Sequence, residues 1–193
     1  MKGMILIMNF DLHEALNNFN SKNANEIENL NKIKKFLSTN DNCFSRTNLK
    51  GHITAGALII DKNCNVLLNH HKTLDKWIHF GGHSDGDSNS LNVAKREVLE
   101  ETGISDFDDM NGQIFDIDVH IIPENSFKKE PVHYHYDIRF LFIAKNADFQ
   151  ISDESLNIKW LPITEAKKQV TDSSMIRMLD KAYALYMNKD LEK

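Results

Sequence analysis

The sequence predicts an α/β (α+β) fold in which helices cover a mixed β-sheet and a helical appendage precedes it. Residues 11–40 carry apolar side chains at helical spacing, whereas residues 51–80 contain short β-rich runs separated by turns. An amphipathic segment, residues 89–102, lies between strands, and further helical patterns end the chain. This order of elements favours a sheet with helices packed on it.

The N-terminal segment has two apolar stripes at helical spacing, in residues 12–19 and 27–37. The polar residues 38–42 separate these stripes from the first strand. We therefore expect residues 1–50 to be a helical extension that packs on a domain formed by residues 51–193. The alternative is that the extension covers a substrate or forms a dimer, so a homodimer stays open.

The remaining elements follow from alternation, turn residues and glycines. Asp61 and Asn63 favour a turn, so the runs on either side of them form a hairpin. Gly81 and Gly82 end a strand, and Gly103 stands where a helix often ends in a left-handed residue. We expect strands at residues 52–60, 65–69, 77–80, 113–122, 131–145 and 157–161, and helices at residues 89–102 and 164–188 with a break near residues 171–173.

Composition limits the class of partner. Apolar residues make up 41% of the 193 residues and charged residues 26%, as in ordinary globular proteins. The formal net charge is −5, and proteins that hold nucleic acid through its phosphates usually carry a basic excess. We therefore expect no nucleic-acid polymer as a partner. A small phosphorylated substrate is compatible with this charge if a metal ion supplies the positive charge.

The cysteines and the N-terminus indicate a cytoplasmic protein. Cys43 and Cys64 show no metal-type pairing, so we expect two free thiols in a reducing compartment. The apolar run in residues 1–8 is too short for a signal-peptide core, and no cleavage site follows it. No run approaches the length of a transmembrane helix, so we expect no membrane partner.

Three glutamates in the predicted helix at residues 89–102 point to a metal site. Glu97, Glu100 and Glu101 stand at positions i, i+3 and i+4, so they share one helical face. Their mutual repulsion is relieved by a hard divalent cation, and carboxylate oxygens are the ligands that Mg²⁺ or Mn²⁺ prefers. The alternative is a solvated acidic face. Gly81 and Gly82 favour the metal site, because a backbone without side chains can approach a metal or phosphate closely.

The segment around these glutamates resembles the sequence signature of a known enzyme family. Residues 82–104 read GHSDGDSNSLNVAKREVLEETGI. They resemble the Nudix box, G-x5-E-x7-R-E-U-x-E-E-x-G-U, in which U is aliphatic. Eight of its nine fixed positions agree, and the first glutamate is replaced by Ser88. The resemblance implies the Nudix fold for about residues 50–190. The matching residues are Gly82, Arg96, Glu97, Val98, Glu100, Glu101, Gly103 and Ile104.

The resemblance also implies an activity and roles for residues. It implies a magnesium- or manganese-dependent hydrolase that splits a P–O–P bond, for example in a nucleoside diphosphate linked to another group. Glu97 and Glu101 would be metal ligands, and Glu100 would be a ligand or the base that activates water. The carbonyl of Gly81 would complete the metal site. Arg96 would orient Glu97 through a charge-assisted hydrogen bond.

Other residues near the box carry weaker implications. The glutamate that Ser88 replaces usually lies in the outer ligand shell, so its loss affects metal affinity and rate more than reaction type. Asp85 or Asp87 is a substitute, although an exposed turn aspartate is the simpler interpretation. Nudix enzymes often place an additional catalytic carboxylate where Glu154 stands, and a loop glutamate is the alternative. Trp77 either stacks on a base or packs in the core.

A second cluster lies in the predicted strand at residues 131–145. Strict alternation places His133, His135, Asp137 and Arg139 on one face and aromatic or aliphatic residues on the other. We expect the ionisable face to line the substrate pocket, with Arg139 pairing a phosphate; the alternative is a plain polar face with internal ion pairs. The H-x-H pair also suits zinc, but it offers only two nitrogens.

Two other functions compete with hydrolysis. Some Nudix domains bind a nucleotide or ADP-ribose without catalysis, and Ser88 favours such a sensor whereas the intact glutamates oppose it. An isomerase similar to isopentenyl-diphosphate isomerase requires a cysteine in the pocket. Cys64 falls in the predicted hairpin turn and Cys43 in a polar connector, which disfavours this chemistry.

Overall fold

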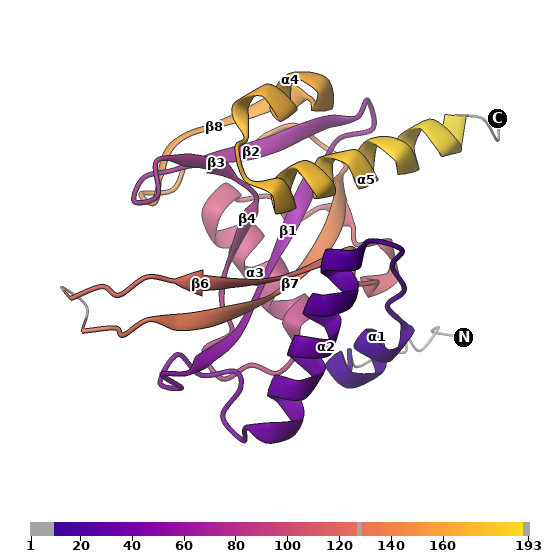
Figure 1. Cartoon of the computed structure of the whole chain (residues 1–193). Helices are drawn as coiled ribbons and strands as arrows, with labels where there is room; N and C mark the ends of the chain where they lie inside the picture. The colour runs from indigo at the N-terminus through magenta and orange to yellow at the C-terminus, as the bar shows by residue number, and fades with distance from the viewer. Residues whose placement is uncertain (1–9, 127–128, 191–193) are drawn as a thin grey trace, which may run out of the picture.

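The computed structural model describes residues 10–126 and 129–190. Within them, eight strands form one mixed sheet, and helices lie on both of its faces (Figure 1). In chain order the elements are α1 (Leu12–Asn18), α2 (Ala24–Thr39), β1 (Gly51–Ile60), β2 (Asn65–His71), β3 (Lys76–Ile78), β4 (Phe80–His83), α3 (Ser90–Thr102), β5 (Phe107–Asp108), a 3-10 turn η1 (Met110–Gly112), β6 (Asp116–Ile122), β7 (His133–Ala144), β8 (Ser155–Pro162), α4 (Ile163–Gln169) and α5 (Ser173–Asp190).

The strand β1 is the centre of the sheet, and its neighbours explain where polar groups collect. It pairs in parallel with β7 along its whole length, from Gly51 opposite Tyr134 to Ile60 opposite Ile143. On the other edge of β1, β4 pairs with residues 54–57 and β2 pairs with residues 59–60, both antiparallel. β2 and β4 therefore diverge from each other at the middle of β1, and β8 extends the sheet beyond β2.

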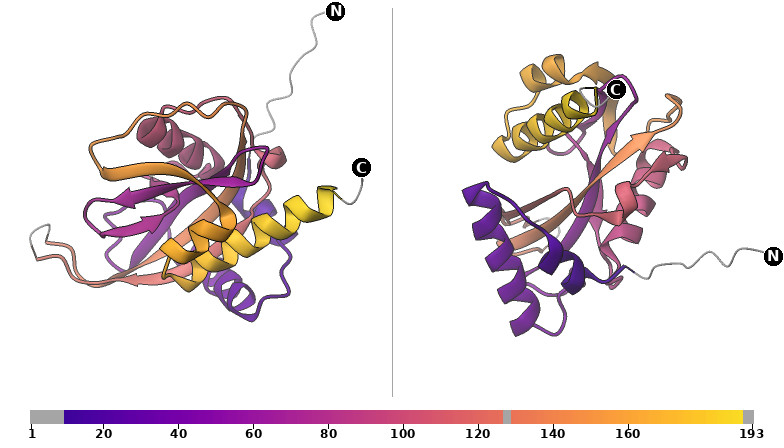
Figure 2. Two further views of the ribbon diagram at one scale, coloured as in Figure 1. Left: turned by 90° about the horizontal axis from the view of Figure 1, so that it is seen from above. Right: turned by 90° about the vertical axis from the view of Figure 1, so that its right-hand side faces the viewer.

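Two hydrophobic cores form on opposite faces of the sheet. Alternation along β1 directs Ile53 and Ala57 toward α3, and Leu58 and Ile60 toward α4 and α5. Figure 2 shows α5 and α3 on opposite sides of the strands. The second core includes Leu58 and Ile60 of β1 but not His52 near the start of this strand, so the core covers only the C-terminal half of β1. The face shared with α4 and α5 thus has an apolar half and a polar half.

The helix α3 forms as its sequence predicts. The Asn89 side chain caps it by accepting a hydrogen bond from the Asn92 N–H at 3.0 Å. Val93 and Val98 are fully buried against the sheet. Gly103 ends the helix with φ of 73° and donates its N–H to the carbonyl of Leu99. The polar face of α3 is consequently held in a fixed position beside β4.

The two N-terminal helices are part of the same body as the sheet. Leu16 and Ile33 are buried in the core that α3 also covers. Phe36 stacks on Tyr136 of β7, with ring centroids 4.0 Å apart. The predicted helices within residues 11–40 are therefore confirmed, and the boundary at residue 50 stays a prediction. Residues 1–9 of the predicted extension lie outside the described residues.

Some predicted elements differ from the observed ones. The run predicted as one strand at residues 77–80 is divided at His79 into β3 and β4. β5 and η1 were not predicted, because each is too short to show a period and η1 contains two non-glycine residues with positive φ, Met110 and Asn111. None of the helices in the described ranges combines the length and apolar character that crossing a bilayer requires.

Candidate active site

The carboxylates of α3 lie beside β4 and β2, where these two strands diverge from each other along β1. Glu101 is 7% exposed, and its Oε1 accepts the Gly81 N–H at 2.9 Å. Its Oε2 accepts a hydrogen bond from the Asn69 side-chain amide at 2.8 Å. Burial, together with the charges of Glu97 and Glu154, raises the pKa of Glu101 to about 8 against the hydrogen bonds from Gly81 and Asn69. This carboxylate therefore lacks a compensating positive charge.

Glu97 is held by an arginine and by a backbone without a side chain. The Arg96 Nη2 donates to Glu97 Oε1 at 2.7 Å and also to the carbonyl of His83 at 2.7 Å. A Cβ at Gly82 would lie 2.5 Å from Glu97 Oε2, so only glycine permits this approach. Burial raises the pKa of Glu97 despite Arg96, and the charges of Glu100 and Glu154 act in the same direction.

Glu100 and Glu154 form the exposed rim of this group. The Glu100 side chain is 63% exposed, and its Oε1 lies 4.0 Å from Arg96 Nε. Glu154 is exposed in the segment before β8, and its backbone carbonyl accepts the Lys72 N–H. Its charge nevertheless reaches both buried carboxylates, because it raises the pKa of Glu97 and Glu101. The structure thus brings a distant glutamate to the carboxylates of α3.

A divalent cation fits this group of carboxylates. Four acids gather here, and the pKa values of two of them, Glu97 and Glu101, are raised. The arginine beside them, Arg96, is already bonded to Glu97. Oxygen ligands alone are what a hard cation such as Mg²⁺ requires. A cation bound there would remove the repulsion that raises both pKa values. Because Gly82 has no side chain beside Glu97, backbone oxygens have room to serve as additional metal ligands.

The loop before α3 contains the position at which the Nudix pattern expects its first glutamate. Ser88 is exposed there. The two nearby aspartates have other partners: Asp85 forms an ion pair with Arg46 at 2.7 Å, and Asp87 accepts the Asn89 N–H at 2.8 Å. Neither aspartate therefore replaces the missing carboxylate among the contacts observed.

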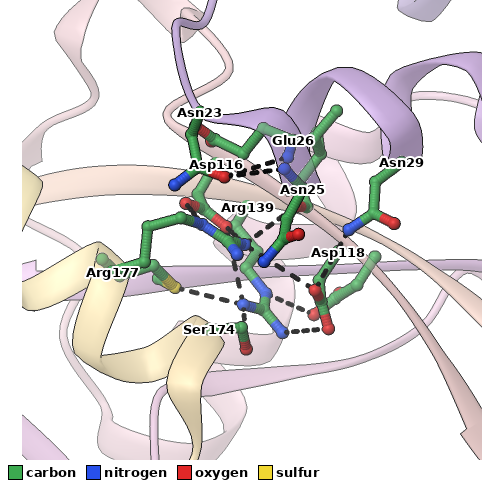
Figure 3. Close-up of polar contacts among 12 residues, drawn as sticks. Asn23, Asn25, Glu26, Asn29, Asp116, Asp118, Arg139, Ser174 and Arg177 are labelled. Carbon is green, nitrogen blue, oxygen red and sulfur yellow. Dashed lines mark hydrogen bonds and ion pairs between the residues drawn. The ribbon is translucent and has the colours of Figure 1, made fainter.

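Arg139, the expected phosphate partner, lies in the internal ion-pair environment that was the alternative to that role. It is 3% exposed, and its Nε donates to Asp137 at 2.7 Å. Its Nη1 donates to the Ser174 hydroxyl at 2.8 Å (Figure 3). It also lies within ion-pair distance of two aspartates on β6, Asp116 and Asp118. The N-terminal turn of α5 covers this face, so Arg139 serves an internal network.

Asp137 belongs to the same network and is likewise not free for substrate. It accepts a hydrogen bond from the Thr54 hydroxyl at 3.0 Å and lies 3.6 Å from His79 Nε2. Burial opposes its ionisation, but Arg139 and His79 outweigh burial and hold the pKa of Asp137 well below its usual range. Alternation along β7 was predicted correctly, and the helix that covers it was not visible in the alternation.

His133 and His135 meet three further histidines that the sequence interpretation did not associate with them. His52 of β1 stands directly opposite His135, and His120 of β6 opposes His135 from the other side. The ring centroids of His83 and His135 lie 5.1 Å apart. The signal was present as one histidine in each of several strands, but only the strand register brings them together.

Two other features lie away from the carboxylates. A groove of about 1030 Å³ is lined by α1, α2 and α5 and includes neither Glu97 nor Glu101. Trp77 stacks on His70 with centroids 4.8 Å apart, and the Lys159 ammonium lies 4.2 Å from its ring centroid. Trp77 thus already has packing partners within the sheet.

Comparisons with known proteins agree with this geometry. A family model, the NUDIX domain, matches residues 50–181. No curated protein matches the sequence. A C. elegans Ap4A hydrolase binary complex superposes with a TM-score of 0.58 at 22% identity, covering 70% of this chain and 98% of that one.

Two further solved structures share the fold. The E. coli dihydroneopterin triphosphate pyrophosphohydrolase has a TM-score of 0.55 at 17% identity and covers 67% of this chain and 92% of its own. The NUDIX domain of Shewanella oneidensis NrtR, complexed with ADP ribose, has a TM-score of 0.52 at 13% identity and covers 78% and 96%. Identities this low show a common fold and leave the substrate open.

Proposed function

The chain belongs to the Nudix family of hydrolases, and we propose that it is a divalent-metal-dependent enzyme that cleaves a phosphoanhydride bond in a nucleoside diphosphate linked to another group. One observation carries the proposal. Glu101, which is buried, and Glu97, which is half-buried, share one face of α3 with raised pKa values and without enough positive charge around them. Such a group of acids is suited to a cation and a phosphorylated ligand.

The proposed metal ligands are Glu97 and Glu101 with the carbonyl of Gly81, and Glu100 is either a further ligand or the base that activates water. When bound there, Mg²⁺ or Mn²⁺ neutralises phosphate charge and polarises phosphorus toward attack by water. The protein supplies the positions of the ligands. The Asn69 amide and the Gly81 N–H fix both oxygens of Glu101, and Arg96 fixes one oxygen of Glu97.

The rim carboxylates are the proposed proton acceptors. Glu100 is exposed on α3, and Glu154 approaches from the segment before β8. In the proposed reaction a water oxygen forms a bond to phosphorus, the P–O bond to the leaving phosphate breaks, and one of these carboxylates takes the proton of the water. Glu154→Gln and Glu100→Gln identify the acceptor, because loss of the group that takes the proton should lower kcat by about two to four powers of ten.

The proposed substrate is small. The net charge of −5 opposes binding of a nucleic-acid polymer. The C. elegans protein is an Ap4A hydrolase, and the Shewanella domain holds ADP ribose, so nucleotides with linked phosphates are the first class to test. We place the enzyme in the cytoplasm, and the support is that Cys43 and Cys64 are buried in two different cores and are not joined in a disulfide.

The test is a hydrolysis screen with Mg²⁺ and with Mn²⁺. The substrates are nucleoside triphosphates, ADP-ribose, dinucleoside polyphosphates, coenzyme A and nucleotide sugars, and products are separated by chromatography. We expect turnover of at least one class, its disappearance in excess chelator and its return with added metal. Full activity in excess chelator would contradict the proposed role of the α3 carboxylates.

The alternative is a sensor that binds a nucleotide or ADP-ribose without turnover, and Ser88 is the observation that favours it. Wild-type protein that is stabilised by ADP-ribose against heat, but hydrolyses nothing in the screen, would establish this alternative. Release of nucleoside monophosphate from the same ligand would exclude it.

A further inference from the structure

The sheet carries a second cluster of metal-ligating side chains outside the carboxylate site. In the described residues, five histidines come from four adjacent strands, β4, β1, β7 and β6, which lie side by side in Figure 1. The cluster occupies the polar half of the face whose other half α4 and α5 cover. We call it the histidine cluster: His52, His83, His120, His133 and His135.

Three of these side chains form a compact ligand set. One nitrogen from each of His52, His133 and His135 lies within 4.8 Å of the others. Tetrahedral zinc with Zn–N bonds of about 2.0–2.1 Å places its ligand nitrogens roughly 3.4 Å apart. The closure needed is thus about an ångström, which rotation of the imidazole rings supplies. The three residues come from two strands whose parallel register is fixed over their whole length.

Several ring nitrogens of these histidines are buried and have no hydrogen-bond partner, which favours a bound ligand. His52 is 3% exposed, yet neither of its ring nitrogens has a hydrogen-bond partner of normal geometry. The Nε2 of His135 is also buried and unpartnered. Buried polar atoms without partners are costly and rare in native proteins. A bound cation takes one nitrogen from each histidine, so it satisfies one of the two unpartnered nitrogens of His52.

The third ligand is oriented by a hydrogen bond from its other ring nitrogen. The Nδ1 of His133 lies 2.8 Å from the carbonyl of Pro131. A carbonyl can only accept, so Nδ1 is the donor in this bond and Nε2 is the nitrogen left to face a metal. Metal-binding histidines are commonly oriented by such a bond from the other ring nitrogen.

We propose that His52, His133 and His135 form a second metal centre, for a transition-metal ion of the Zn²⁺ type. Imidazole nitrogens suit Zn²⁺, whereas Mg²⁺ requires oxygen ligands, and no carboxylate belongs to this set within the described chain. His83 lies 5.0 Å from His52 between ring centroids and offers the fourth ligand. The centre joins β1 to β7 and is chemically distinct from the α3 carboxylates.

The two centres are connected through one side chain. Arg96 bonds both the carbonyl of His83 and the carboxylate of Glu97. The backbone of the histidine cluster is therefore adjacent to the carboxylate site, although the ligand sets do not overlap. This separation allows each centre to be removed without touching the other.

The test uses full-length protein without an affinity tag, stripped by a chelator and titrated with Zn²⁺ against a chromophoric competitor. We expect one zinc ion per chain, a rise in melting temperature on zinc binding, and a tetrahedral absorption spectrum when Co²⁺ replaces Zn²⁺. Absence of stoichiometric zinc binding, or a Co²⁺ spectrum of octahedral oxygen coordination, overturns the proposal. These measurements on wild type stand even if a variant fails to fold.

Variants then locate the ion. His133→Ala and His135→Gln should weaken zinc binding by more than the roughly tenfold to hundredfold loss that follows removal of an outer-shell partner. His13→Gln, which changes an exposed histidine of α1, is the matched control and should bind zinc as wild type does. Glu101→Gln should also retain zinc. Loss of zinc in Glu101→Gln, or retention in both cluster variants, assigns the ion elsewhere and overturns the proposal.

Discussion

The carboxylates on α3 and those on β6 and β7 are similarly buried but face different surroundings. Glu101 meets only an amide and a backbone N–H, and Glu97 meets a single arginine. The aspartates on the strands meet the positive charges of the chain itself (Figure 3). Those ion pairs join Asp116, Asp118 and Asp137 to Arg139, Arg177 and Lys181.

The pKa values of the two groups shift in opposite directions. Burial raises the pKa of Glu97 and Glu101, and nothing near them reverses it. In Asp118 and Asp137 burial is outweighed by histidine and arginine partners, so both pKa values are lowered. Acids alone therefore do not mark a functional site. The site is the place where the protein leaves acids without compensation.

Loss of one carboxylate that has no positive charge beside it should have the largest effect on turnover. Glu101→Gln should lower turnover by about two to four powers of ten, the range for one essential catalytic group. The metal-free melting temperature should hold steady or rise, because a neutral amide replaces a buried acid whose ionisation burial opposes. Steady-state rates and metal-dependent melting check both statements.

The control for this substitution is Glu28→Gln, which removes an exposed glutamate of α2 that pairs with Lys32. It should leave turnover and metal-dependent stabilisation unchanged. Equal losses in both variants would show that overall charge matters and not the α3 site.

Loss of a compensating cation should act on stability. Arg139→Ala leaves Asp137 buried without its arginine partner and removes one of the cations around Asp116, and breaking a buried ion pair in this way costs about 3–5 kcal/mol. Urea unfolding of wild type and variant measures the difference. A variant of wild-type stability with a raised KM would instead return Arg139 to the role of substrate ligand.

Adding an acid should sharpen the contrast at the metal site. Ser88→Glu restores the missing Nudix glutamate at an exposed position, so the fold should tolerate it. We expect metal affinity to rise by roughly tenfold, the lower end of the effect of outer-shell partners, with the rate kept or raised. Titration of activity against Mg²⁺ concentration measures it. A large loss of rate would show that the site is built around a small residue.

The smallest effect concerns an acid that backbone groups compensate. Asp172 caps α5 by accepting hydrogen bonds from the N–H groups of Ser174 and Met175. Burial opposes its ionisation, but these bonds win and lower the pKa of Asp172. Asp172→Ala should cost about 1 kcal/mol at neutral pH. The folded pKa lies below the unfolded one, so the difference should persist above about pH 4 and vanish as pH falls through the folded value; urea unfolding across pH checks this.

The carboxylate site was predictable because its residues are close in sequence. Helical spacing places Glu97 and Glu101 on one face, and Gly103 marks the end of their helix. Asn69 was not predicted as a partner, since it stands in β2 and reaches Glu101 only in the folded sheet. Local periods show which residues share a face, and they do not show what lies opposite.

The same limit explains why alternation alone does not assign the roles of the polar side chains on β7. Alternation correctly grouped His135 with Arg139, but it gave them one role. The start of α5 covers Arg139 through Ser174 and Met178, whereas His135 lies beyond that cover beside His52. A single strand thus serves an ion-pair network at one end and a histidine cluster at the other.

The parallel pairing of β1 with β7 has a consequence for how the chain acquires its structure. Thr54 and Asp137, which bond across this pair, are 83 positions apart in the chain. Such distant contacts form late, because a long loop must close before they contribute. Until β7 arrives, β1 is a ten-residue segment without a charged side chain and buried along its whole length in the finished fold. Uncharged β-rich segments of this kind self-associate when exposed, so the growing chain is most prone to aggregation between synthesis of β1 and synthesis of β7.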